Sequence, residues 1–365
     1  MTLPVGLSET YCPRLLRTVA AHGLRGGSLQ AWPSAALDET AWQTFVGLVS
    51  MHRMWSLLAD ATVAGAFPAN EVQREEILKQ DTAAVLTCLY LDRALVETHH
   101  ALTKRGIDAR VYKGVSSALA FYAEPGMRTY SDIDLIVRAD QLDDLVEVLG
   151  AAGATRLGPN RWSAFQLIGG WEIDPQESLR DGPFGASIPV QELFETTPTL
   201  QVAETEIPTL TDAALILAAC YHAILPGDLR RLVPLRDVAE MLLSDRFDAD
   251  TVLEHADRWQ GSIVVATAVR AAADMFEMAP TTPLLSWATA YKPSAREQRW
   301  LGAYHELNPR AYVLKQICYT TLAYPTARQG ARYLHGQLFH QGHDSLFHRT
   351  RRLWSRQSGT GLAPR

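Results

Sequence analysis

The stretch that decides the fold runs from Val111 to Val137 and reads VYKGVSSALAFYAEPGMRTYSDIDLIV. It begins within DARVYKG, in which a short apolar run leads into a glycine, and this pattern predicts a short strand. GVSSALAFYAEPG then predicts one short helix, which Pro125 and Gly126 end. SDIDLIVRAD, rich in Ile, Leu and Val, predicts a second strand. We therefore expect two neighbouring strands of a small sheet, joined by a helix that packs on it.

Two carboxylates stand on the second of these strands. Asp132 and Asp134 are two residues apart, so both side chains leave the same face, roughly 6 to 7 Å apart along the chain. Among apolar neighbours, their mutual repulsion and desolvation call for a compensating charge, which a divalent cation bound by oxygen ligands supplies. The alternative is an ordinary acidic pair in water at a strand end, because the spacing alone is common.

A candidate phosphate site precedes the carboxylates. Lys113 and Gly114 end the first strand, and the next helix opens on Val-Ser-Ser. Free backbone N–H groups, the hydroxyls of Ser116 and Ser117 and the Lys113 ammonium could converge there on a phosphate. The alternative is a glycine that serves only the geometry of the turn.

Two further charged positions belong to the same neighbourhood. Arg128 lies just before the Asp132 strand, where its fork could reach a phosphate or either aspartate; the alternative is an ion pair with Glu124. A third carboxylate is offered by WEID, in which Asp174 shares a strand face with Glu172. Alternation along the strand does not decide which of these two completes a metal triad.

The rest of the chain is mainly helical. Apolar residues recur at three and four positions from about Leu15 to about Lys104 and again after Pro208. Short runs between Ala154 and Asp174, separated by glycine turns, predict hairpin-connected strands, so the sheet is mixed and the fold class is α+β. The expected divisions are a helical region over 1–106, a sheet-containing core over 107–182, a Pro- and Thr-rich junction over 183–208 and a helical domain over 209–365.

Composition excludes several classes of protein. With 47% hydrophobic and 20% charged residues, the 365-residue chain is expected to be globular. A net charge of -6 leaves no global positive field for nucleic acid or membranes. The start lacks the features of a signal peptide, and no apolar run is long enough to span a bilayer, so a cytoplasmic protein without membrane contact is expected. The four cysteines lie far apart, and each is expected to be a buried, reduced thiol.

The stretch from Val111 to Val137 resembles the signature of the uncharacterised nucleotidyltransferase family, within the DNA polymerase β-like superfamily: Lys-Gly, a helix, Tyr, Pro-Gly-x-Arg and a DxD strand. The resemblance implies metal ligands at Asp132 and Asp134 and a third at Asp174. It extends to LAACYHAILPGDLRRLVPLRDVAEML, where His222 and Asp237 match the family's pattern. This chain departs from the pattern after Asp174, where it has Pro-Gln in place of Leu-His.

The resemblance implies a metal-dependent transferase. It predicts that a nucleoside monophosphate moves from a nucleoside triphosphate such as ATP to a hydroxyl or phosphate, with release of pyrophosphate. A two-metal site holding Mg²⁺, with Mn²⁺ as the alternative ion, is expected. The acceptor, bound by the C-terminal helical domain, is left open among a small molecule, a peptide or protein, and RNA. The competing hypothesis is a non-catalytic nucleotide-binding or partner-binding protein that retains the fold.

Two features near the C-terminus, and His222, each allow more than one interpretation. The basic residues there could contact phosphates of RNA or of an acceptor, although a solvated helix face is the simpler interpretation. Histidines in the same segment have no spacing typical of a zinc site. His222 could face the acceptor or lie hydrogen-bonded in the core. The basic residues are Arg328, Arg332, Arg349, Arg351, Arg352, Arg356 and Arg365.

Overall fold

The computed structural model describes residues 11–25, 29, 31–158, 162–225, 231–279 and 282–339. The predicted N-terminal helices are confirmed. The longest of them begins at a capping box, in which Asn70 Oδ1 accepts a hydrogen bond from Gln73 N at 2.9 Å, and it ends just before Gly106, whose φ is 69°. These helices are α1 (Tyr11–Ala21), α2 (Glu39–His52), α3 (Trp55–Val63) and α4 (Glu71–Lys104).

A mixed sheet follows, as the sequence predicts. In the part of the chain that the structure describes, it has five strands in the order β1-β2-β5-β4-β3. β2 pairs antiparallel with β1 and parallel with β5, whereas β4 is antiparallel to both of its neighbours. The elements are β1 (Ala109–Tyr112), α5 (Gly114–Phe121), η1 (Pro125–Met127), β2 (Asp132–Val137), α6 (Leu142–Ala151), β3 (Thr155–Arg156), β4 (Phe165–Gln166) and β5 (Glu172–Gln176).

The interval 183–208, in which the sequence shows no clear period, contains regular structure. It carries α7 (Pro183–Ala186), η2 (Val190–Phe194) and an antiparallel hairpin of β6 (Thr199–Val202) and β7 (Thr205–Pro208). A parallel bridge between Val111 and Thr209 places the end of this hairpin beside β1. Strands of four residues are too short for alternation to show in the sequence.

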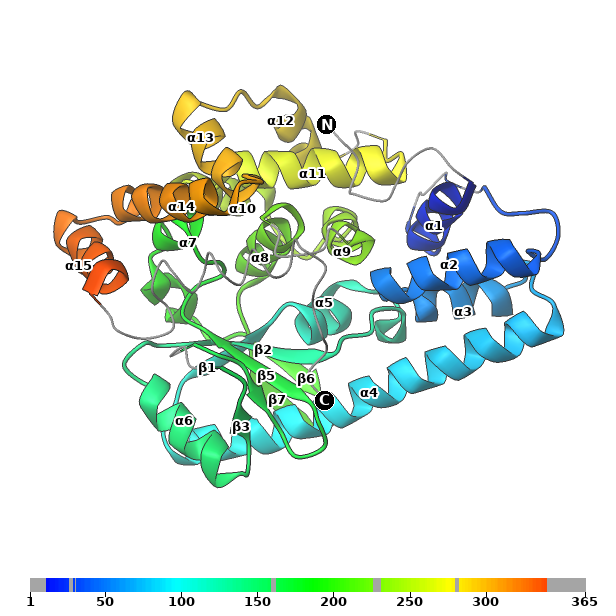
Figure 1. Cartoon of the computed structure of the whole chain (residues 1–365), viewed down its shortest axis with the longest axis horizontal. Helices are drawn as coiled ribbons and strands as arrows, with labels where there is room; N and C mark the ends of the chain where they lie inside the picture. Colours follow the sequence, from blue (N-terminus) through cyan, green and yellow to red (C-terminus); the bar gives the residue numbers. More distant parts are fainter. Residues whose placement is uncertain are drawn as a thin grey trace.

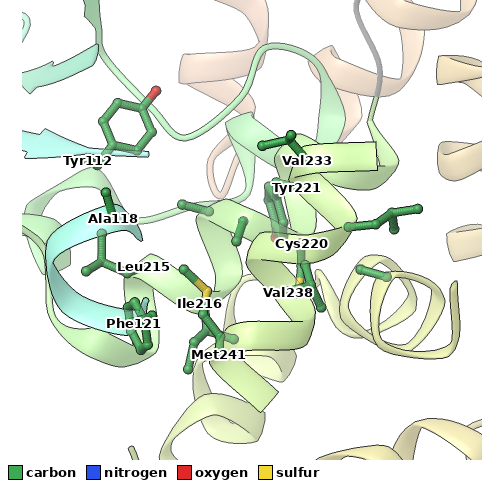
Figure 2. Close-up of a cluster of buried hydrophobic side chains, with 14 of the residues drawn as sticks. Tyr112, Ala118, Phe121, Leu215, Ile216, Cys220, Tyr221, Val233, Val238 and Met241 are labelled. Carbon is green, nitrogen blue, oxygen red and sulfur yellow. The ribbon is translucent and has the colours of Figure 1, made fainter. Parts of the chain in front are cut away.

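The chain after the hairpin is helical, as predicted. Figure 1 shows α4 running along one side of the sheet, with α5, α8 and α9 between the sheet and the later helices. Figure 2 shows buried side chains from these middle helices, among them Phe121, Ile216 and Met241, in one apolar cluster. The elements are α8 (Asp212–Ile224), α9 (Leu232–Leu242), α10 (Ala249–Arg258), α11 (Ser262–Phe276), α12 (Pro283–Ala290), α13 (Ala295–Tyr304), α14 (Pro309–Ala323) and α15 (Ala327–Phe339).

The structure also bears on the expectations for membrane spans, cysteines and the basic C-terminal residues. Among the described residues, no helix is long and apolar enough to cross a membrane. Cys88, Cys220 and Cys318 are free thiols. Cys220 is buried as expected, whereas Cys88 is only partly buried and Cys318 is exposed; the side chain of Cys12 lies outside the described residues. Of the C-terminal basic residues, Arg328 and Arg332 are exposed on α15, whereas those from Arg349 onward lie outside the described residues.

A buried arginine ties the first helix to the C-terminal half. Arg236 of α9, 1% exposed, donates from Nη1 to the carbonyl oxygens of Ala20 and His22, both at 2.6 Å. Its Nη2 donates to Glu240 Oε1 at 2.7 Å. Burial raises the pKa of Glu240, and Arg236 opposes that rise. The guanidinium therefore satisfies three oxygens that water does not reach freely.

We expect Arg236→Met to lower the free energy of unfolding by about 3–5 kcal/mol, because the Glu240 carboxylate then remains buried without its partner. Urea denaturation would measure the loss. The matched control is Arg93→Met on α4, where the side chain is 79% exposed in its pair with Glu97, and it should leave the free energy of unfolding almost unchanged. Equal costs for the two substitutions would contradict a structural role for Arg236.

Candidate functional site

A cavity of about 780 Å³ opens between the carboxylate-bearing face of the sheet and the helices of the C-terminal half. Six of the residues predicted from the sequence line it together, although they come from separate segments of the chain. Other parts of its wall come from α7, α8, α14 and α15. The six are Lys113, Gly114, Arg128, Asp132, Asp134 and Asp174.

Burial distinguishes the two carboxylates that could accompany the aspartate pair. In the parallel pairing of β2 with β5, Asp134 lies opposite Asp174 and Asp132 lies opposite Glu172, so the register by itself places each beside an aspartate. Asp174 is partly buried and lines the cavity, whereas Glu172 is exposed and does not line it. Of the two carboxylates that alternation left open, Asp174 is therefore the one that shares the cavity with Asp132 and Asp134.

Lys113 balances the charge of the buried aspartate. Its Nζ lies 2.7 Å from Asp134 Oδ1, and Asp134 is only 7% exposed. Burial opposes the charge on Lys113, but Asp134 and Tyr112 together outweigh that effect, so the pKa of the lysine is raised. Lys113 also has a φ of 57° and a ψ of -132°, a backbone conformation that residues other than glycine rarely adopt. The strained turn presents this ammonium to the carboxylates.

The cluster carries more negative charge than Lys113 offsets. Burial, followed by the neighbouring Asp134, raises the pKa of Asp174 to about 6. Burial also raises the pKa of Asp134, with Lys113 opposing that rise and Asp132 adding to it. Both shifts show that ionising the whole set is unfavourable in the protein alone. Such a set of oxygen donors suits a divalent cation chemically.

The carboxylates are engaged with other groups in this structure. Gln176 Nε2 donates to Asp174 Oδ2 at 2.7 Å, and Ser131 Oγ donates to Asp132 Oδ1 at 3.2 Å. Within the described ranges, no three His, Cys, Asp or Glu side chains converge closely enough to hold a metal ion. The carboxylates are oxygen donors of the kind that divalent cations bind, but as the protein stands they do not converge on one point, and Asp134 is held by Lys113.

Arg128 has a partner that neither sequence interpretation named. Its Nε and Nη2 donate to the two oxygens of Asp237 on α9, at 2.7 and 2.9 Å, and its Nη1 donates to Thr129 O at 2.6 Å. Tyr122 Oη donates to the same carboxylate at 2.9 Å. This bidentate pair is buried, so the loop before β2 is fastened to the C-terminal half. The alternative pairing with Glu124 is wrong.

The turn after β1 provides a glycine but not the two hydroxyls. A Cβ on Gly114 would lie 2.7 Å from Tyr130 Cβ, which explains the glycine by close approach. Ser116 Oγ donates to Val111 O at 3.2 Å, and Ser117 is 3% exposed. Neither serine lines the cavity, so the expectation that both hydroxyls meet a phosphate is not met. The short helix turns these side chains into the core.

Two arginines in the cavity wall were not predicted as part of the site, and His222 was named there only as one of two alternatives. Arg53, at the end of α2, and Arg231, just before α9, line the cavity on the side of Asp132. His222 of α8 is exposed to the cavity and is not a core residue. Burial by the surrounding protein, followed by the charges of Lys113 and Arg180, lowers the pKa of His222 well below its usual value. The family pattern around His222 is the one sequence signal that pointed to it.

The far end of the cavity is rich in tyrosine. α14 and α15, with the segment between them, contribute Tyr312, Tyr324 and Tyr333, and the rings of the last two have centroids 5.6 Å apart. Gln316 and Thr320 stand one turn apart on α14 in the same wall. Gln316 Nε2 and Thr320 Oγ1 are buried and have no hydrogen-bond partner among the described residues. This wall therefore has buried polar groups that no described residue satisfies.

Comparison with solved structures gives distant likenesses. The crystal structure of ANT(2'')-Ia in complex with adenylyl-2''-tobramycin is 14% identical and has a TM-score of 0.36, covering 47% of this chain and 97% of that chain. A solution structure of the antibiotic-resistance factor ANT(2'')-Ia is 16% identical, with a TM-score of 0.33 over 49% of this chain and 92% of that one. An antigenic nucleotidyltransferase-like protein from Paracoccidioides brasiliensis is 15% identical, with a TM-score of 0.33 over 53% and 96%. At these scores, the likenesses carry nothing about the site.

Comparison of sequences is decisive about the family. No curated protein sequence matches significantly. A profile of the family described as uncharacterised nucleotidyltransferase, however, matches residues 38–277, which is more than half of the chain. The matched segment runs from the N-terminal helices through the sheet to the end of α11 and includes Asp132, Asp134, Asp174 and Asp237. The chain therefore belongs to the uncharacterised nucleotidyltransferase family, and it is an enzyme that transfers nucleotides.

Proposed function

We propose that the protein transfers a nucleoside monophosphate from a nucleoside triphosphate to a hydroxyl or phosphate of an acceptor, with release of pyrophosphate and dependence on a divalent metal. The observation that carries this proposal is that Asp132, Asp134 and Asp174 stand on two adjacent strands and line one cavity. Family membership supports nucleotide transfer in general. The three carboxylates support the proposal that this transfer depends on a metal.

The three aspartates are the proposed ligands of Mg²⁺, with Mn²⁺ as the alternative. When bound, such ions withdraw charge from the phosphoryl group and acidify the attacking hydroxyl. Asp174, the third proposed ligand, would lower the pKa of the acceptor hydroxyl through the shared ion or take its proton. Lys113, at the Gly114 turn, would offset negative charge on the phosphates. Because Asp237 offsets the charge of Arg128, we assign Arg128 chiefly the positioning of the loop before β2.

We propose that the C-terminal helices bind the acceptor. The tyrosine-rich wall of α14 and α15 belongs to the same cavity as the carboxylates, and its unpartnered Gln316 and Thr320 groups could bind a polar acceptor. Tyrosine rings beside such groups favour an acceptor with both flat apolar surface and hydroxyl groups. This supports a small molecule over a long nucleic acid, because the wall encloses part of a cavity instead of forming an open groove.

The double substitution Asp132→Asn with Asp134→Asn should lower nucleotidyl transfer by about a thousandfold or more. It removes two negatively charged metal ligands, whereas the size of the side chains stays almost the same. The assay supplies Mg²⁺, α-labelled nucleoside triphosphates and fractionated lysate as the source of acceptors, and it follows labelled product and pyrophosphate. Asp144→Asn, on the exposed face of α6, is the matched control and should leave turnover unchanged.

The same proteins test the non-catalytic alternative. Calorimetry with ATP, with and without Mg²⁺, should show tighter binding with the metal in the wild type and little metal effect in the double variant. Metal-indifferent ATP binding by the wild type, together with turnover that survives the double substitution, would sink the proposal.

The raised pKa of Asp174 predicts how metal binding depends on pH. As the pH falls through about 6, its carboxyl group gains a proton and becomes a poor metal ligand. The affinity for Mn²⁺ should therefore decrease below that pH, approaching about tenfold per pH unit, and should be steady above about pH 7. Asp174→Asn should bind Mn²⁺ weakly and lose most of this pH dependence. Electron paramagnetic resonance titrations between about pH 5 and pH 8 would measure it, and constant wild-type affinity would contradict the assignment.

A further inference from the structure

Two arginines in the cavity wall, Arg53 and Arg231, differ from Lys113 and Arg128 in the same wall. Lys113 and Arg128 each contact a carboxylate at 2.7 Å, in the pairs with Asp134 and Asp237. Arg53 Nη1, by contrast, lies 4.0 Å from Asp132 Oδ1 and donates to the neutral Ser131 hydroxyl. Arg231 Nε is buried and has no hydrogen-bond partner among the described residues. Within the part of the chain that the structure describes, Arg53 and Arg231 therefore keep donors and positive charge that no carboxylate takes up at close range.

The two guanidinium groups are held near each other despite their like charge. Burial, followed by the charge of Arg53, lowers the pKa of Arg231, and Asp132 opposes that change. The backbone beside them is fastened, because Leu232 N donates to His52 Nδ1 at 3.0 Å and so joins the end of α2 to the start of α9. His52 is 2% exposed, and burial followed by Arg231 lowers its pKa to about 4, so it remains a neutral acceptor.

The local backbone also favours a role for the Arg53 side chain. Arg53 ends α2 with a φ of 57° and a ψ of 49°, the left-handed conformation that glycine or asparagine adopts at lower cost. Arg231 is the residue before α9, whose first turn reaches the cavity through Val233 and Pro234. The first turn of that helix therefore lies beside the same cavity as the two guanidinium groups. The combined field is that of an anion site beside Asp132.

Building on the proposed function, we propose that Arg53 and Arg231 form a clamp for a polyphosphate: the terminal phosphates of the donor nucleotide, which leave as pyrophosphate. Two planar guanidinium groups match phosphate oxygens with paired N–H donors, which an isolated ammonium does not. The position beside Asp132 places the clamp next to the carboxylates and away from the tyrosine-rich wall. Residues at the ends of α2 and α9 would thus make the phosphate contacts that the Ser116 and Ser117 hydroxyls do not make.

Binding without metal and without turnover tests the clamp. The probes are tripolyphosphate, pyrophosphate, ATP and AMP, titrated by calorimetry into the full-length protein in buffer containing a chelator. Wild-type protein should bind tripolyphosphate and bind ATP more tightly than AMP. Arg53→Gln and Arg231→Gln should each weaken tripolyphosphate and ATP binding by about tenfold or more, and AMP binding by less than about twofold. Arg53→Lys, which keeps the charge but loses the fork, should fall between.

The control is Arg93→Gln, a charge loss on the exposed surface of α4, which should change no affinity. Unligated melting temperatures of the variants should match the wild type, and if Arg53→Gln melts early, Arg53→Lys carries the comparison. No tripolyphosphate binding by the wild type, equal binding by the double glutamine variant, or equal losses for AMP and ATP would overturn the clamp. Phosphate-length recognition that depends on both arginines, in a protein that transfers no label, would uphold the clamp and refute the proposed function.

Discussion

The pairing of Lys113 with Asp134 is the interaction on which the site depends. Three aspartates share one face of the sheet, and in the protein alone Lys113 is the cation in close contact with the most buried of them. Their excess charge appears as raised pKa values at Asp134 and Asp174. The strained turn at Lys113 shows that the backbone accepts a cost to hold an ammonium there, where glycine would be the relaxed choice.

A second buried pair joins the sheet to the helical half. Because Asp237 receives both ends of the Arg128 fork, the loop that leads into β2 takes its position from α9. Tyr122, just after α5, donates to the same carboxylate, so the strand, the short helix and α9 share one polar centre. A bidentate pair of this kind specifies orientation as well as contact. The carboxylates of β2 are thus positioned by residues far away in the chain.

The cavity has two chemically different ends. Beside Asp132 the wall is cationic, through Arg53 and Arg231, whereas the wall of α14 and α15 is aromatic with polar groups such as Gln316. The carboxylates lie between an anion-attracting region and a region suited to an uncharged ring. His222, exposed to the cavity and kept neutral by burial and nearby cations, adds a hydrogen-bonding group without charge. A donor with a polyphosphate tail and an acceptor with hydroxyls would meet at this boundary.

The sequence by itself determined the strand–helix–strand unit, the helical flanks, the mixed sheet and the common face of Asp132 and Asp134, because periodicity and turn residues act over a few positions. It could not decide between Glu172 and Asp174, because the packing of the helices over the sheet determines that Asp174 lines the cavity and Glu172 does not. It also missed the partner of Arg128, 109 residues away, and the place of Arg53, 78 residues from Ser131. Only the tertiary structure settles such contacts, because packing of distant segments, and not local spacing, determines which charges are buried together.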